Sequence, residues 1–351
     1  MKPRIAARLL IAALAAAPIL GAVASSGTDT TRAARDLVAA LRPAQKTALI
    51  QPFAGEERTS WSYFPGRRPG VALKDLEPPE REAVFALLRT ALSAQGMKRT
   101  EGVIILEGVL RQMSAFGFGR DPDLYYLTFF GEPAAEGAAT PWAFRFEGHH
   151  LSLHFSSATG KLVSSTPAFF GAEPSTVLSG PHKGLRVLGD QEDAGRRLLE
   201  SLDATQRKAA IIATSAPGDI ILRPSRQNVP EPEGLPASQM NDAQKKLLLD
   251  LIAVFTGNLR EDQARAQTEK IQKAGIDGIR FAWAGETRPG GVFYFRAQGP
   301  TFVLEHDVTQ SGADHVHSVY RDLENDFGGD ALRRHYAESP HHAGARPRLG
   351  G

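Results

Sequence analysis

The sequence of 351 residues contains no cysteine. Disulfide bonds, thiolate metal ligands, a cysteine nucleophile and a lipid-modified cysteine are therefore excluded together. Several signature motifs are also missing: a Walker loop, a Gly-x-Gly-x-x-Gly run after a strand, Gly-x-Ser-x-Gly and His-Glu-x-x-His. The sequence thus gives no support to the common nucleotide-binding, dinucleotide-binding, serine-hydrolase or zincin functions.

Long apolar runs are lacking too, except for Leu9 to Leu20 near the start of the chain. Lys2, Arg4 and Arg8 precede this run and Ala22-Val23-Ala24 follows it, which is the pattern of an export signal spanning residues 1–24. The run is short for a bilayer span, so an uncleaved anchor is only the alternative interpretation. We expect a periplasmic or secreted protein with no membrane attachment after cleavage.

Neither sign of charge is in excess. The chain has 41 Lys+Arg and 39 Asp+Glu, and removing the three basic residues of the signal leaves 38 against 39, a balance of −1. A near-neutral chain argues against a general phosphate-binding surface, so we expect no nucleic-acid partner. A chain of this length can bury enough apolar surface as one large or two medium domains.

Two pairs of segments resemble each other in the same order along the chain. Arg35–Lys46 is echoed by Arg196–Arg207, and Trp142–Gly148 is echoed by Phe293–Gly299. Repeats in this order indicate two copies of one unit. We therefore expect copy 1 over residues 25–188, copy 2 over residues 189–336, and a disordered tail over residues 337–351.

Each copy shows helical periodicity first and strand-like alternation afterwards. The expected helices of copy 1 lie around Leu37–Leu49, from Pro78-Pro79 onward and over Glu101–Met113, and those of copy 2 over Glu192–Leu202, after Asn241-Asp242 and over Arg260–Ala274. The expected strands are Tyr125–Phe130, Trp142–Phe146, His149–Phe155 and Leu162–Thr166 in copy 1, and Ile279–Trp283, Val292–Ala297, Thr301–His306 and His315–Tyr320 in copy 2. Three helices followed by antiparallel strands, twice, predict an α+β fold with the copies related by a pseudo-twofold axis and their sheets adjacent or merged.

Six of the ten histidines fall in these predicted strands, where the two copies differ. Aligning Gly148 with Gly299 sets His149 opposite Pro300, His150 opposite Thr301 and His154 opposite Glu305. The remaining three are His306, His315 and His317. The copies keep their aromatic residues but differ at these positions. We therefore expect the histidines to serve a function that is not repeated in both copies.

Strand spacing predicts which histidines can act together. His315 and His317 are two residues apart, so they share a strand face at roughly 6.5–7 Å and can ligate one ion as neutral imidazoles. Adding His149 or His150 from copy 1 and a carboxylate such as Glu305 or Asp322 predicts a divalent metal site, with zinc or copper as the ion. Two alternatives stay open, namely a strand face of hydrogen-bonded histidines and acid–base catalysis without metal.

Other conspicuous residues have simpler interpretations. Arg145 and Arg296 occupy matching positions and would either bind an anion together or form structural ion pairs. Asn325–Asp330 is expected to be a turn that leads into a helix over Ala331–Tyr336. The aromatic residues are expected to lie in the core: Trp142, Phe144, Trp283, Phe293 and Phe295.

Several segments resemble the bacterial and fungal family named domain of unknown function 3500. The resemblance rests on Glu147–Leu151, Thr166–Pro174, His315–Arg321, Asn325–Gly328 and Leu332–Tyr336, and it covers most of the chain. The family usually has Asn at the position of His154 and Tyr at that of Phe327. What it implies is a residue pattern without a known reaction: His149, His150, Glu305, His315, His317, Arg321 and Asp326.

Two functions follow from these observations. The first is an exported metal-dependent hydrolase in which His315, His317 and one of His149 or His150 hold the ion. In it Glu305 is a ligand or general base, Arg321 stabilises negative charge and Asp326 completes the catalytic set. The second is a non-catalytic binding protein that takes a small anion or carbohydrate between the copies. Either function implies a small-molecule partner.

Overall fold

The computed structural model describes residues 27–113, 120–133, 140–222, 224 and 229–329. The predicted export signal, the predicted C-terminal tail and the helix predicted over Ala331–Tyr336 lie outside these ranges. These three assignments stay predictions. No helix within the described ranges is both long and apolar enough to cross a membrane.

Helices and strands alternate in two blocks along the described chain. The α-helices are α1 (Gly27–Ala40), α2 (Pro43–Leu49), α3 (Pro78–Ala91), α4 (Ala94–Met113), α5 (Gly189–Ser201), α6 (Ala204–Ala210), α7 (Asp242–Thr256) and α8 (Glu261–Ala274). The strands are β1 (Ile50–Gln51), β2 (Val71–Ala72), β3 (Tyr126–Phe130), β4 (Trp142–Gly148), β5 (Leu151–Ala158), β6 (Lys161–Ser164), β7 (Ala168–Ala172), β8 (Ile211–Ala213), β9 (Leu235–Pro236), β10 (Arg280–Gly285), β11 (Phe293–Gln298), β12 (Phe302–Gln310) and β13 (His315–Asp322). Short 3₁₀ helices cover Glu56–Thr59, Leu73–Asp75, Ala237–Gln239, Ile276–Gly278 and Asp326–Gly328.

Local sequence signals explain where the helices begin. Pro43 and Pro78 stand in the first turns of α2 and α3, where the missing N–H costs nothing. Asn241 caps α7 as expected, because its side chain accepts the backbone N–H of Gln244 at 2.9 Å. The break at Pro43 divides the helix predicted around Leu37–Leu49 into two. In the second block Asp203 likewise caps a separate helix, α6, so each block of the described chain has four α-helices rather than the predicted three.

The described strands form one mixed sheet of 13 strands rather than two adjacent sheets. Its main order is β1-β3-β4-β5-β7-β13-β12-β11-β10-β8. The two central strands, β7 and β13, are antiparallel, with Val319 opposite Phe169. β7 is absent from the predicted strands, since Pro167, Gly171 and Pro174 make its sequence resemble a loop. The strand that connects the first block to β13 of the second, β7, is therefore one that the sequence pattern does not predict.

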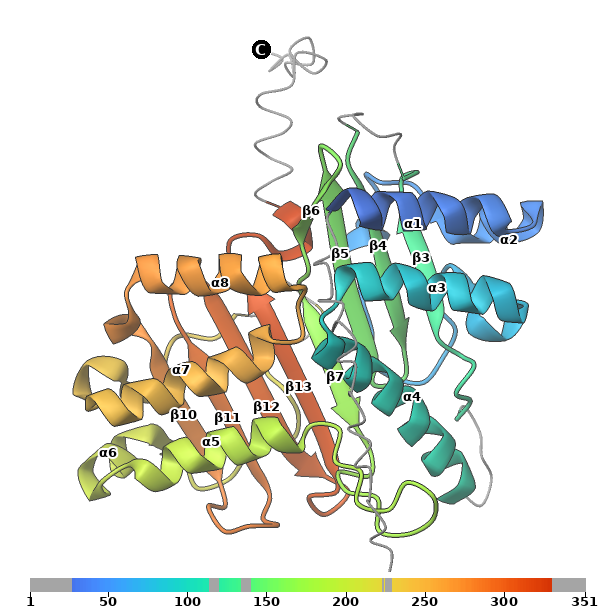
Figure 1. The fold of residues 1–351 in the computed structure, drawn as a ribbon. Helices are drawn as coiled ribbons and strands as arrows, with labels where there is room; N and C mark the ends of the chain where they lie inside the picture. Colours follow the sequence, from blue (N-terminus) through green and yellow to red (C-terminus); the bar gives the residue numbers. More distant parts are fainter. Residues whose placement is uncertain (1–26, 114–119, 134–139, 223, 225–228, 330–351) are drawn as a thin grey trace, which may run out of the picture.

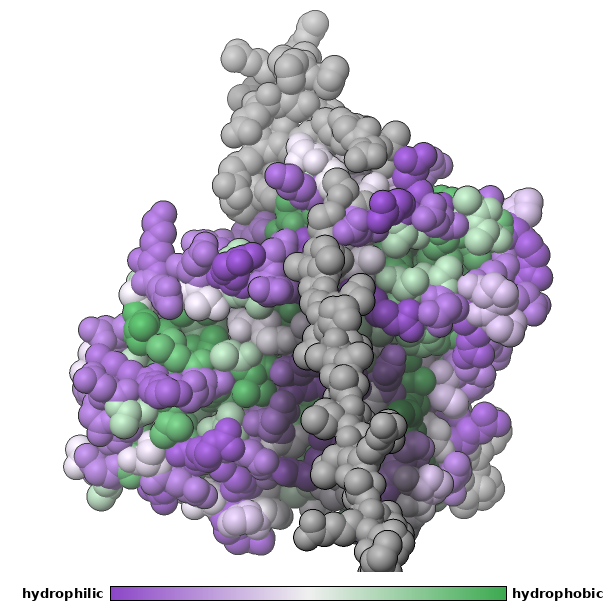
Figure 2. Space-filling view, in the orientation of Figure 1, coloured by the Kyte–Doolittle hydropathy of each residue, from purple (hydrophilic) through white to green (hydrophobic). Residues whose placement is uncertain are grey.

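Helices cover one face of this sheet. Figure 1 shows α1–α4 in front of the strands of the first block and α5–α8 in front of those of the second. Figure 2 shows hydrophilic side chains on the outward surfaces of these helices, with hydrophobic ones between neighbouring helices. The predicted core aromatics are confirmed as buried: Trp142, Phe144, Trp283, Phe293 and Phe295. The α+β prediction is thus confirmed.

Two loops contribute to a second, smaller core. Trp61 and Tyr63 come from the segment between β1 and β2, and Ile220 and Leu222 from the segment between β8 and β9. They pack with strand residues that include Phe169 of β7. Both loops are rich in Pro and Gly. Their packing brings loop residues close to the histidines at one end of the central strands.

Candidate functional site

The sequence predicts that His149 and His150 begin a strand. In the structure they form a turn instead. Gly148 pairs with Leu151, so the two histidines are the tip of the β4–β5 hairpin. His150 has a φ of +60°, which is uncommon for a residue with a side chain. Its N–H donates to the Tyr63 carbonyl at 3.0 Å and its carbonyl accepts from Gly171 N at 2.7 Å. These bonds fix the turn between a loop and the central strand β7.

Three imidazoles converge at this end of the sheet. The Nε2 atom of His315 lies 2.7 Å from Nε2 of His150 and 3.0 Å from Nε2 of His317. The alternate positions of His315 and His317 on β13 direct both rings to one side. The structure therefore brings one histidine of the first block together with two of the second. Potential ligand atoms of these three residues all lie within 4.8 Å of one another.

Carboxylates approach the outer nitrogens of two of these rings. His317 Nδ1 lies 2.6 Å from Asp219 Oδ1, and Asp219 Oδ2 accepts the Tyr63 hydroxyl at 3.0 Å. His315 Nδ1 lies 3.6 Å from Glu173 Oε1. The Asp219 carboxylate, which is at hydrogen-bond distance, places the proton of His317 on Nδ1 and leaves its Nε2 lone pair free. The sequence does not predict three neighbours of these rings, because they come from loops distant in sequence from β13: Asp219, Glu173 and Tyr63.

Burial keeps the converging rings neutral. His150 is 3% exposed, and burial, followed by the neighbouring His149, holds its pKa well below the usual value. Burial, then His317, lowers the pKa of His315 to about 3. Both rings are therefore uncharged at neutral pH, which is the state required of a metal-ligating imidazole.

His149 turns away from the converging nitrogens although its ring stacks on His150 with centroids 3.7 Å apart. Its Nδ1 lies 2.5 Å from Glu107 Oε2 of α4, and Arg120 Nη1 lies 2.8 Å from its ring nitrogens. Of the two histidines offered as the third ligand, His150 has the required geometry. His149 instead links the hairpin tip to α4.

The predicted catalytic residues bond to groups other than the converging histidines. Glu305 accepts the N–H groups of Ile221 at 3.1 Å and Leu222 at 2.7 Å, and also the Tyr294 hydroxyl. Burial raises the pKa of Glu305, which is fully buried. Through these contacts the carboxylate holds the loop of Ile221 and Leu222 against β12. Its role as ligand or general base stays a prediction without geometric support.

Arg321 and Asp326 are a buried pair at the other end of β13. Their side chains form an ion pair at 2.6 Å, and Asp326 also accepts the N–H of Asp322 at 3.0 Å. Arg321 is four residues beyond His317, roughly 13 Å along a strand. Asp322, the other carboxylate considered for the metal, bonds Gln267 and Lys270 at that same end. The structure therefore does not bring these three residues to the histidines.

Arg145 and Arg296 form separate structural ion pairs. Arg145 pairs with Glu57 and Glu147 at 2.6 Å, and Arg296 pairs with Glu233 at 3.2 Å. Four strands separate β4 from β11, so the guanidinium groups cannot bind one small anion together. The ion-pair interpretation is confirmed, and the binding-protein hypothesis loses its proposed anchors.

Asp307 is a poorly compensated carboxylate near the site, since its Oδ2 atom has no hydrogen-bond partner within the described residues. It lies directly across from His317 in the β12–β13 register and is 1% exposed. Burial, with the nearby Asp219 carboxylate as a further cause, raises its pKa to about 7. Asp307 is a neighbour of His317 because of the register between β12 and β13. The spacing of residues in the sequence does not predict that register.

His154 and His306 are buried histidines outside the converging group. His154 lies 3.1 Å from the Ser152 hydroxyl. His306 stacks on Phe295 with centroids 4.9 Å apart, and burial lowers its pKa to about 3.

His306 is expected to make the fold less stable in acid. The unfolded chain takes up a proton near pH 6.5 while the folded chain does not, so stability falls as pH decreases between about 6.5 and 3. The loss from this residue is about 2 kcal/mol at pH 5. Urea unfolding at pH 7 and pH 5 measures it, with His306→Phe as the comparison. An equal pH-dependent change in both proteins would refute the assignment.

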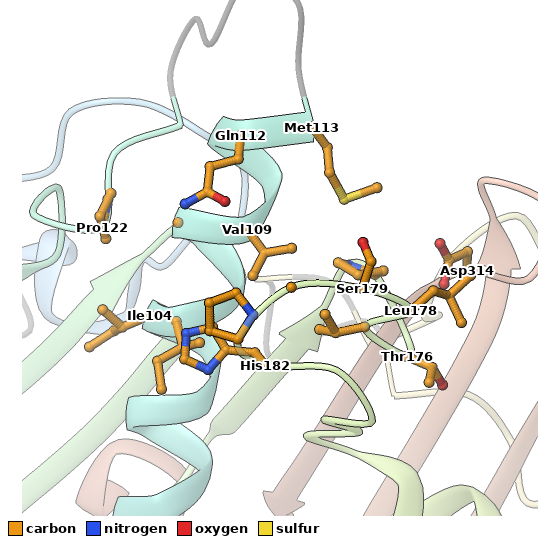
Figure 3. A pocket seen from close by; sticks show the side chains of 16 residues that line it. Ile104, Val109, Gln112, Met113, Pro122, Thr176, Leu178, Ser179, His182 and Asp314 are labelled. Atoms are coloured by element: carbon orange, nitrogen blue, oxygen red, sulfur yellow. The ribbon is translucent and has the colours of Figure 1, made fainter.

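A cavity of about 580 Å³ lies beside the histidines. Figure 3 shows it between α4, which contributes Ile104, Val109 and Met113, and the loop that carries Leu178 and His182. Pro174 and Asp314 also line it, and each adjoins a residue of the site, Glu173 and His315 respectively. The cavity is mostly apolar and does not itself contain the converging imidazoles.

The comparisons with known proteins identify a family but no activity. No curated protein matches the chain, and no solved structure does. Residues 24–329 match the family described as "Protein of unknown function (DUF3500)". This range includes both blocks and all three converging histidines. The chain therefore belongs to the DUF3500 family, as its resemblance had indicated.

Proposed function

We propose that this protein is a metal-dependent enzyme, of hydrolytic type, whose ion binds to His150, His315 and His317. The observation that carries the proposal is the convergence of three Nε2 atoms, at 2.7 and 3.0 Å from the central one. Three imidazoles leave one tetrahedral position open for water or substrate, as in catalytic zinc sites. Zinc is the ion that this ligand set fits best, with copper as the alternative.

The surroundings of the three rings support a metal rather than a chain of hydrogen bonds. Asp219 lies 2.6 Å from Nδ1 of His317, which directs the Nε2 lone pair of that ring inward. His315 Nε2 cannot donate one proton to two neighbours at once. With Zn–N bonds of about 2.0–2.1 Å, tetrahedral ligands stand about 3.3 Å apart, so the rings need to separate by only several tenths of an ångström.

Water can reach the site on the side of His315. The side chain of His315 is 12% exposed, and those of Glu173 and Asp219 are 18% and 22% exposed. A bound divalent ion lowers the pKa of a ligated water towards neutrality and polarises carbonyl or phosphoryl oxygens. Glu173 is a carboxylate beside the rings that is accessible enough to accept a proton.

We further infer that the two blocks are copies related by a pseudo-twofold axis between β7 and β13. The strand order supports this, because counting from either edge gives a short parallel strand, a three-stranded meander and a central strand. His150 then corresponds to Thr301, and the site is present at one end of the sheet only. With the predicted export signal, we place the enzyme in the periplasm or outside the cell.

Hydrolysis assays test the proposal. The purified chain, stripped with a chelator and reloaded with Zn²⁺, is assayed on p-nitrophenyl esters and phosphates. We expect turnover that appears on reloading and falls at least 100-fold in His315→Ala, because the ion is lost. His182→Ala, an exposed histidine at the cavity, serves as the control. Zinc binding by His315, without turnover of any of these substrates, would contradict the hydrolase.

A further inference from the structure

Next to the three histidines lies a second group of potential ligands. Asp219, Asp307 and His317 each offer an atom, and these atoms all lie within 4.8 Å of one another. The group shares His317 with the proposed metal site but takes Asp219 from a loop and Asp307 from β12. His317 presents its other ring nitrogen here, since Nδ1 is the atom 2.6 Å from Asp219 Oδ1.

The two carboxylates are unequally satisfied. Asp219 accepts from His317 and from the backbone N–H of Ile220 at 2.7 Å, both at Oδ1, and from the Tyr63 hydroxyl at Oδ2. Asp307 accepts the Thr309 hydroxyl at Oδ1, 2.6 Å away. Its Oδ2 atom is buried without a hydrogen-bond partner in the described part of the chain.

An unpartnered buried carboxylate oxygen is costly unless a proton or a cation compensates it. Within the described ranges, no Arg or Lys forms an ion pair with Asp307 or Asp219. Asp307 is also fixed in place by its position on β12, opposite His317. The group therefore has the composition of a cation site. It has two carboxylates and one imidazole nitrogen, and one carboxylate oxygen, Asp307 Oδ2, has no hydrogen-bond partner within the described residues.

We propose that Asp219, Asp307 and His317 form a second divalent-cation site, so that the centre holds two ions with His317 between them. The proposal rests on the proposed function, since His317 Nε2 serves the first ion. The second ion replaces the proton on His317 Nδ1, which is released to solvent, and the ring becomes a bridging imidazolate. Two carboxylates and an imidazole suit Zn²⁺ or Mn²⁺.

The bridge determines what the second ion can do. With metal–nitrogen bonds of about 2 Å on both sides of the ring, the ions stand about 6 Å apart. That is wider than the roughly 3.5–4 Å at which two ions clamp the same phosphoryl group. The second ion therefore neutralises the two aspartates and fixes the His317 ring, while the first retains the open position.

Metal titration of the full chain tests the second site. Apo protein is titrated with Zn²⁺ and, separately, Mn²⁺ by calorimetry, and bound metal is counted after gel filtration. We expect two equivalents of Zn²⁺ for the wild type, one for Asp307→Asn, and one for His150→Ala, which alters only the first site. Asp277→Asn, an exposed aspartate bonded to Lys245, is the control and should retain two.

The outcomes separate the two proposals. One equivalent in the wild type that His150→Ala abolishes would overturn the second site and leave the first intact. One equivalent that only Asp307→Asn abolishes would support the second site and overturn the three-histidine site. No bound metal in the wild type would overturn both. A wild-type count of two or of zero is itself a result, even where a variant fails to fold.

Discussion

Zinc is expected to raise the melting temperature of the wild type and to leave that of a His315→Ala/His317→Ala double variant unchanged. A ligand that binds only the folded state stabilises it by about 4 kcal/mol at 1000 times its Kd. Because the unfolding entropy is about 2.1 cal/mol/K per residue, a chain of this length shifts by about 1.5 °C per kcal/mol, so the expected shift is about 6 °C. Differential scanning calorimetry with and without excess Zn²⁺ measures it.

The double variant removes two of the three converging Nε2 atoms. Its apo form should still fold, because alanine keeps the backbone bonds of β13 to β7 and β12. His182→Ala controls for adventitious zinc binding by an exposed histidine and should shift like the wild type. An equal zinc-induced shift in the double variant would show that the ion binds elsewhere.

Replacing Gly171 by valine is expected to destroy the metal site although no proposed ligand is itself substituted. A Cβ atom at this position would lie 2.8 Å from Cδ2 and 2.9 Å from Cγ of His150, closer than real contacts allow. Gly171 lies inside β7, where valine is otherwise favoured. The strand should therefore persist while the His150 ring is displaced, with zinc affinity at least about 100-fold lower.

Isothermal titration with Zn²⁺ measures the effect of Gly171→Val. The matched control is Gly278→Val, because a Cβ atom at Gly278 meets nothing within 4 Å. Comparable far-UV circular dichroism spectra of both variants would verify that the sheet remains. Wild-type zinc affinity in Gly171→Val would mean that His150 is not a ligand.

The sequence predicted the parts of the site that depend on short-range spacing. The two-residue interval between His315 and His317 predicts a shared strand face, whatever the rest of the fold. The alternation of helical and strand-like segments likewise predicted most elements of both blocks. The capping residue Asn241 even located the start of α7.

The remaining features depend on long-range contacts. His149 and His150 were assigned to a strand, but the pairing of Gly148 with Leu151 makes them a turn, and this redirects both rings. Asp219 lies 98 residues from its partner His317, in a segment with no regular pattern. Asp307 faces His317 only through the register of β12 and β13. Neither contact is encoded in local spacing.

The family resemblance predicted a residue pattern that combines two different environments. His150, His315 and His317 lie together at one end of the central strands. Glu305, Arg321 and Asp326 instead bond to buried structural partners. A sequence does not show whether a polar residue bonds backbone groups in the core or binds a metal. The residue pattern alone therefore could not separate the structural residues from the proposed ligands.

Metal content of the purified full chain tests the central claim most directly. Wild type and His315→Ala/His317→Ala are dialysed against Zn²⁺, then against metal-free buffer, and analysed by inductively coupled plasma mass spectrometry. The three-histidine site predicts at least one zinc per wild-type chain, and a loss of at least one equivalent in the double variant. Equal zinc content in the two proteins would contradict the site.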